Sequence, residues 1–172
     1  MPLNDIQLAC TGSALVIGAP VRGWREWTIT ADGLRGAQGG FWRPGTNTAE
    51  CLGKHAAMLR VLDDALAVAG VPTPPHTVER WCTCGLYSWR RPDRIRARSA
   101  KVAGVVESWG RVLVGEHGYR AQYARVVAVC GPRRGIADAH PTGDERAAVA
   151  ARYSVPYFET LDDAVAHFDE GR

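Results

Sequence analysis

The sequence has no long apolar stretch. No segment approaches the ~20 uninterrupted apolar residues that a membrane span needs. The short run at residues 15–17 lacks the basic leader and the small-residue cleavage pattern of a secretory signal. We therefore expect a cytoplasmic protein. Its 172 residues, 46% hydrophobic and 23% charged, suit one domain with a packed core, or such a domain with a modest appendage.

The sequence also lacks the short motifs of several common enzyme classes. It has no Gly-x-x-x-x-Gly-Lys-Ser/Thr phosphate loop, no Gly-x-Gly-x-x-Gly after a predicted strand and no Gly-x-Ser-x-Gly elbow. The paired His-x-Glu and Pro-Cys-x-x-Cys motifs of zinc deaminases are absent too. Glu107, Glu116 and His117 are the polar groups in predicted loops that a metal-dependent or nucleotide-processing enzyme could use. A non-enzymatic protein is the stronger expectation.

Lysine is scarce, and the charges are unevenly distributed. Only two of the 21 basic residues are lysine, Lys54 and Lys101, and the net charge is +3. Residues 80–125 nevertheless contain ten basic and three acidic residues, whereas residues 138–172 contain eight acidic and three basic ones. Such an uneven charge distribution indicates charged binding partners, or docking between these two parts of the chain, and says little about the fold.

Five cysteines, an odd number, fit poorly with a fully paired disulfide framework. In a reducing compartment, clustered cysteines are more often metal ligands or buried thiols. Cys82 and Cys84 are separated by one residue, which places both thiols on the same side of an extended strand, and Gly85 lets the chain curl there. Cys10 and Cys130 lie among small or apolar residues and are expected in the core.

A structural zinc ion needs about four nitrogen or sulfur ligands. Cys51 can supply the third. We prefer His76 for the fourth, because a proline-rich connector brings it beside Cys82. His55 is the alternative, since it follows Cys51 by four residues and would face the same way on a helix. The prediction is a structural zinc held by Cys51, His76, Cys82 and Cys84; the competing interpretation is buried thiols without a metal.

Hydrophobic periodicity predicts strands and helices in one chain. Helical spacing and caps favour helices at residues 48–69, 144–153 and 160–168. Alternating or β-branched patterns favour strands at residues 24–29, 34–36, 86–89, 102–109, 111–114 and 119–129. Turn residues predict hairpins around residues 31–33 and around Gly110. Residues 90–101 are expected to form a basic loop or a short helix opened by Pro92.

These elements predict an α+β protein. We expect a small antiparallel β-sheet or pseudo-barrel with a zinc-stapled helix and loop in residues 1–135. An acidic helical C-terminal appendage, residues 136–172, would pack on this core.

Six tryptophans are many for this length, and most are expected to build the core. The functional alternative is that two or three of them stack on a base while neighbouring arginines contact phosphate. The residues expected to bind nucleic acid or another partner are Trp81, Trp89, Arg90, Arg91, Arg94, Arg96, Arg98 and Arg120.

Five short motifs lie along the chain: Trp42-x-Pro44-Gly45, Cys82-x-Cys84-Gly85-Leu86-Tyr87, the run from Val102 to Val112, Gly118-Tyr119-Arg120-Ala121 and Arg152-Tyr153-x-Val155-Pro156. Together they resemble a family of small proteins of actinobacteria and their phages, over roughly residues 23–168. That resemblance implies a source and the cysteine site, and no known activity. The strand at residues 102–109 is also loosely similar to PUA-like and ASCH-type barrels, which bind RNA or flipped modified bases.

The sequence therefore predicts a non-enzymatic, zinc-stabilised protein that contacts nucleic acid through a basic Trp/Arg face, in a regulatory or phage–host role. One alternative is a protein-interaction module, such as a phage effector, in which the basic face meets an acidic host protein. The other is the metal-dependent or nucleotide-processing enzyme named above.

Overall fold

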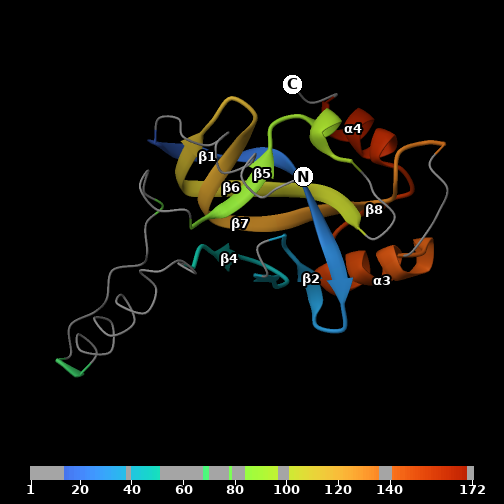
Figure 1. Ribbon diagram of the computed structural model, residues 1–172, viewed down its shortest axis with the longest axis horizontal. Coiled ribbons are helices and arrows are strands. Elements are labelled where there is room, and N and C mark those ends of the chain that lie inside the picture. Colours follow the sequence, from blue (N-terminus) through green and yellow to red (C-terminus); the bar gives the residue numbers. More distant parts are fainter. Residues whose placement is uncertain are drawn as a thin grey trace.

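The computed structural model describes residues 14–37, 40–50, 68–69, 78, 84–96, 101–135 and 141–169. Within these ranges the fold is mixed α+β, with eight strands in a mostly antiparallel sheet and two α-helices (Figure 1). The predicted α+β class is confirmed. The strands are β1 (Ala14–Thr30), β2 (Gly33–Arg35), β3 (Phe41–Trp42), β4 (Asn47–Thr48), β5 (Leu86–Trp89), β6 (Val102–Val114), β7 (Gly118–Cys130) and β8 (Tyr157–Phe158). The helices are α3 (Gly143–Tyr153), α4 (Leu161–Asp169) and the short 3-10 helix η1 (Pro92–Arg94).

Four strands pair in a closed ring. β6 is antiparallel to both β1 and β7, and β5 pairs with β7 along its whole length. The ring closes where Trp89 of β5 pairs with Trp24 of β1. Such closure is the arrangement of a small barrel, which leaves few strand edges open. β2 and β3 extend the sheet from β1, while β4 and β8 pair with β7.

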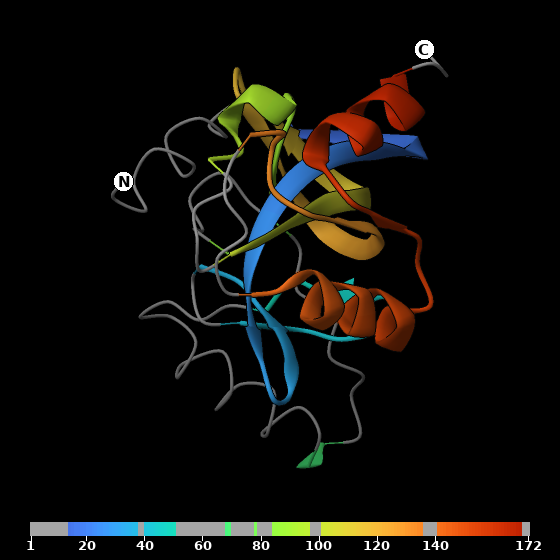
Figure 2. The same ribbon diagram turned by 90° about the vertical axis from the view of Figure 1, so that its right-hand side faces the viewer.

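The two faces of β6 and β7 pack into two hydrophobic clusters. Val102 and Val106 belong to the cluster that α3 completes with Val149, Ala150 and Tyr153. Ala103 and Val105, one residue out of phase, belong to the cluster that α4 completes with Leu161 and Ala164. Figures 1 and 2 show α3 and α4 on opposite sides of the end of β7, where β8 pairs with it. Because both faces are covered there, residues 102–106 of β6 and 126–130 of β7 are apolar.

The close strand packing at Gly104 requires glycine. A Cβ there would collide with the carbonyl oxygen of Ala128 on β7 and would lie 2.9 Å from the indole of Trp27. Trp27, fully buried, packs edge-on against Trp42 at 5.5 Å between ring centroids. Trp24 and Trp89 are also buried, so the expectation of a tryptophan-built core is confirmed for these four.

Two element predictions are wrong. Gly110 does not end a strand: β6 runs on to Val114, and Gly110, at φ +75°, lies where the register with β7 shifts between Trp109 and Val112. A glycine in the left-handed backbone region can form a β-bulge as readily as a turn. The helix predicted from residue 48 does not begin there either, because Thr48 pairs with Tyr123 in the sheet. Residues 51–67 of that helix lie outside the described residues.

The C-terminal elements contribute to the main clusters. The hydroxyl of Tyr153 contacts both Leu34 and Trp42, and β8 pairs in parallel with the end of β7. Thr142 and Glu145 form a capping box at the start of α3. The predicted boundary at residue 135 stays a prediction. Among the helices of the described part, none combines the length and apolar character needed to cross a membrane.

Candidate functional site

Only one of the four predicted zinc ligands, Cys84, belongs to the described residues. Cys51, His76 and Cys82, like the alternative His55, lie outside them. Cys84 is buried just before β5, and its carbonyl oxygen accepts a hydrogen bond from Arg120 at 3.3 Å.

Gly85 has φ +133°, so the chain bends directly after Cys84 as the sequence predicts. No group of three or more His, Cys, Asp or Glu side chains suited to a metal is present within the described ranges. The zinc site therefore stays a prediction. Cys130 is buried in the core, and burial raises the pKa of its thiol to about 12, which keeps it protonated and inert.

The predicted partner-binding residues divide into exposed and buried groups. Arg90, Arg91, Arg94 and Arg96 are exposed at and after the end of β5. Trp89 and Arg120 are buried, at 8% and 5% exposure. Trp81 and Arg98 lie outside the described residues. The side chains that can meet a partner directly are therefore the arginines around η1.

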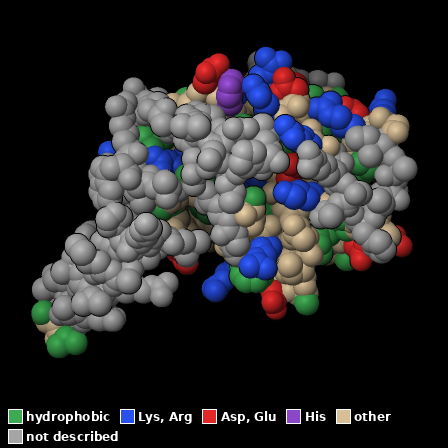
Figure 3. All heavy atoms as spheres, viewed as in Figure 1, with side chains coloured by type: hydrophobic (Ala, Val, Ile, Leu, Met, Phe, Trp, Pro, Cys, Tyr) green, Lys and Arg blue, Asp and Glu red, His purple; other side chains and the backbone are tan. Residues whose placement is uncertain are grey.

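Three of these arginines line a hollow of about 420 Å³. Its lining, which we call the η1 surface, consists of Arg90, Arg91, Asp93, Arg94, Glu116, His117 and Tyr119. The Arg94 guanidinium lies 3.4 Å from Nδ1 of His117, and the Arg90 guanidinium lies 6.0 Å from the centre of the Tyr119 ring. Figure 3 shows Lys and Arg side chains, with a few acidic ones among them, over the upper part of this face.

The backbone holds this arrangement in place. The N–H of Arg90 donates to the carbonyl of His117 at 2.9 Å, which ties the end of β5 to the β6–β7 turn. Ile95 is buried directly after η1, and Arg133 donates to the carbonyl of Pro92 at 2.8 Å. Pro92 opens η1 as predicted. The exposed arginines therefore project from a backbone fixed at several points.

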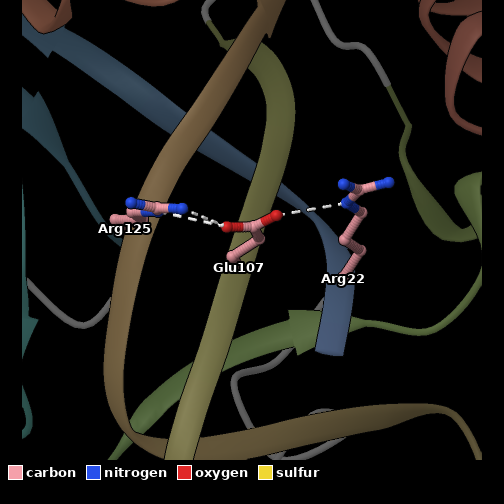
Figure 4. A network of polar contacts seen from close by, with 3 residues as sticks. All are labelled: Arg22, Glu107 and Arg125. Carbon is pink, nitrogen blue, oxygen red and sulfur yellow. Dashed lines mark hydrogen bonds and ion pairs between the residues drawn. The ribbon is translucent and has the colours of Figure 1, made fainter. Parts of the chain in front are cut away.

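Glu107, one of the enzyme candidates, is held between two arginines. It lies on β6 and accepts from Arg125 of β7 at 2.7 Å and from Arg22 of β1 at 3.3 Å (Figure 4). Burial alone would raise the pKa of Glu107, but the hydrogen bonds from Arg125 and Arg22 outweigh it and lower the pKa below its usual value. A carboxylate held ionised in this way is a poor general acid near neutral pH.

The other two enzyme candidates belong to the η1 surface. Glu116 is 83% exposed at its side chain, and its carboxylate lies 3.7 Å from Nε2 of His117. Asp93, the second acid at this hollow, lies 3.2 Å from Arg91. The hollow is open, and its basic groups outnumber its acids. That composition suits binding of an anionic surface better than acid–base chemistry.

Arg25 of β1 is a further candidate that the sequence pattern does not predict. Its guanidinium lies over the indole of Trp42, 4.7 Å from the ring centre, in a separate pocket of about 260 Å³. A charged residue in an alternating strand is normally expected to face solvent. The signal that could have found it is its place between two core tryptophans, Trp24 and Trp27.

Comparison of the chain with protein-family models, with curated proteins and with solved structures finds no match.

Proposed function

We propose that the protein is a non-enzymatic nucleic-acid-binding protein that contacts the phosphate backbone through the η1 surface. The observation that carries the proposal is the grouping of three exposed guanidinium groups, those of Arg90, Arg91 and Arg94, around one hollow. Guanidinium groups suit phosphate because they donate paired hydrogen bonds to its oxygens.

The aromatic and imidazole groups of the surface add to this fit. Tyr119 and His117 are each partly exposed beside the arginines. Tyr119 also lines the neighbouring hollow that contains Arg22 and Glu107. Tyr119 therefore joins the hollow that contains Arg94 to the one that contains Arg22, and two adjoining hollows suit a nucleic-acid strand better than one isolated phosphate.

The proposal is non-enzymatic because the candidate acids do not suit catalysis. Glu107 is committed to Arg22 and Arg125, and Glu116 is exposed. The zinc ion predicted from Cys51, His76, Cys82 and Cys84 belongs to the same proposal as a structural element. Its support is the cysteine spacing and the bend at Gly85.

A charge-matched pair of variants tests the η1 surface. Arg91→Ala removes an exposed arginine whose ion pair joins two exposed side chains, and Arg134→Ala removes an exposed, ion-paired arginine elsewhere. We expect Arg91→Ala to weaken binding to a fluorescent oligonucleotide about 5- to 10-fold at ~0.1 M salt, as for the loss of one phosphate contact. Arg134→Ala should bind like the wild type.

The combined variant Arg90→Ala/Arg91→Ala/Arg94→Ala should abolish measurable binding while circular dichroism and melting temperature stay close to those of the wild type, because all three side chains are exposed. Wild-type affinity in this folded triple variant would refute the proposal. If binding instead survives only to an acidic protein in nuclease-treated extract, the surface recognises a protein and the nucleic-acid proposal fails.

A further inference from the structure

Arg25 is a half-buried cation whose Nε is fully enclosed. It projects from β1, and its Nη1 donates to the backbone carbonyl of Tyr87 on β5. Its Nε is buried and has no hydrogen-bond partner within the described part of the chain. Its other contact is with the face of Trp42. No carboxylate pairs with it among the described residues.

A buried charge without a counter-ion is costly, so proteins normally pair it or leave it out. Burial lowers the pKa of Arg25 to about 10, partly offset by Tyr87. The guanidinium is therefore still charged at neutral pH. One carbonyl and one aromatic face satisfy only part of a group that has five N–H donors. Nε is enclosed by the protein, so the donors that remain for another acceptor are those on Nη2.

The pocket beside Arg25 is small and polar at its rim. Its lining includes Arg25, Gly36, Phe41, Trp42, Arg43 and Glu50, which we call the Arg25 pocket. Its volume of about 260 Å³ is just below the ~300–1,000 Å³ typical of drug-sized ligands. The pocket therefore suits a small molecule.

Hydrogen bonds to backbone groups fix the walls of the pocket. The side chain of Asn47 accepts from the N–H of Arg43 at 2.7 Å and donates to the carbonyls of Arg43 and Gly45, which holds the loop before β4. Gly36 forms the opposite wall, and its N–H donates to the carbonyl of Gly40 at 2.9 Å. A Cβ at Gly36 would lie 2.7 Å from Nη2 of Arg25, so a larger residue there would require the guanidinium to move.

We propose that the Arg25 pocket binds the oxyanion group, a carboxylate or phosphate, of a small molecule on the guanidinium of Arg25. Arg43, exposed at the rim, adds a second positive charge, and Glu50 is the opposing acid. Phe41, 51% exposed, offers an apolar surface at the entrance for the remainder of the ligand. An oxyanion would supply the counter-charge and acceptors that Arg25 lacks.

This site is separate from the η1 surface and does not depend on its function. Gly85 and Leu86 line the Arg25 pocket at the start of β5, whereas Arg90 and Arg91 follow the end of that strand. The two sites share no lining residue. Each can therefore be removed by variants that leave the other in place.

The test is isothermal titration of the full chain with three probes at constant ionic strength: inorganic phosphate, adenosine monophosphate and benzoate. Chloride serves as the reference anion. We expect saturable binding of at least one probe. Binding of the two phosphates alone identifies a phosphate ligand, and binding of benzoate alone identifies a carboxylate ligand; either result supports the site.

Two variants locate the binding. Gly36→Ala should displace the guanidinium and reduce affinity at least tenfold, and Arg43→Ala should reduce it several-fold with an unchanged melting temperature. Arg134→Ala, at an arginine that is exposed and lines neither site, is the control and should bind each probe like the wild type. Absence of saturable binding by all three probes would overturn the proposal. So would wild-type affinity in both Arg43→Ala and Gly36→Ala, because the anion would then bind outside the Arg25 pocket.

Discussion

The hydroxyl of Tyr153 accepts a hydrogen bond from the backbone N–H of Leu34 at 3.0 Å, and both residues are buried. The same hydroxyl donates to the carbonyl of Trp42. Gly33 makes room for it, since a Cβ there would lie 2.8 Å from the Tyr153 oxygen. One side chain of α3 therefore fixes both β2 and β3, and the Arg25 pocket is lined by β3 and by Gly36, directly after β2.

Replacing Tyr153 with Phe should destabilise the protein. The change leaves a buried N–H and a buried carbonyl without their partner, which costs about 1–3 kcal/mol. Urea denaturation followed by tryptophan fluorescence measures the loss. Tyr119→Phe is the control, because the Tyr119 hydroxyl has no hydrogen bond within the described part of the chain, and its unfolding free energy should change little. Equal stability of the two variants would contradict the assigned role of Tyr153.

The lowered pKa of Glu107 predicts that the stability of the folded protein depends on pH. Its pKa is lower in the folded state than in the unfolded chain, so its stabilising contribution is complete above the unfolded value of about 4.3 and is lost as the pH falls through the folded value. Glu107→Gln should therefore cost about 1 kcal/mol at pH 7, as expected for a partly exposed ion-pair network.

At pH 3 the difference between wild type and Glu107→Gln should shrink, because the native carboxyl is then increasingly protonated. Urea denaturation at the two pH values measures this. Glu116→Gln, at an exposed carboxylate, should have little effect at either pH. A Glu107→Gln difference that is the same at pH 3 and pH 7 would show that the effect is not due to charge.

Gly104 gives a test of the strand packing. Gly104→Ala forces a methyl group against the Ala128 carbonyl and the Trp27 ring, and the overpacking should cost about 1–3 kcal/mol. Gly40→Ala is the matched control, since nothing lies within 4 Å of a Cβ at that position. Thermal melting should separate the two variants by several degrees. Similar melting temperatures would mean that β6 and β7 are not so closely packed there.

The predicted zinc site is tested by metal analysis of the purified protein. We expect about one zinc per chain, and we expect Cys82→Ser/Cys84→Ser to lose both the metal and much of its stability, because structural zinc contributes directly to folding. Cys130→Ala, at a buried thiol outside the predicted ligand set, should keep the metal. Wild-type protein that folds without zinc would remove the site from the proposal.

The sequence predicts the regular elements well where local signals agree with tertiary pairing. The β-rich pattern at residues 24–29, the turn at residues 31–33 and the cap at Thr160 lead to the observed β1–β2 hairpin and α4. Prediction from the sequence fails where pairing with a strand distant in the sequence determines the structure of a segment. Thr48 joins β7 instead of opening a helix, and β6 continues through Gly110 because β7 pairs on both sides of the bulge.

The candidate site shows the same division. Local composition predicts that arginines gather after β5, and the structure brings Arg90, Arg91 and Arg94 together. The burial of Arg120 follows from its place on β7 between β5 and β6, which its position in the sequence does not show. Arg25 escaped prediction for a similar reason: its partners, Trp42 and the Tyr87 carbonyl, come from distant strands.

Binding of oligonucleotides as a function of salt concentration tests the central proposal most directly. Fluorescence anisotropy between about 50 and 300 mM salt should give a linear fall of log K with log salt. Three phosphate contacts predict a slope of about −2 to −3, and Arg91→Ala should make it shallower by about one unit. Undetectable binding to DNA and RNA, or affinity that does not change with salt, would contradict the account.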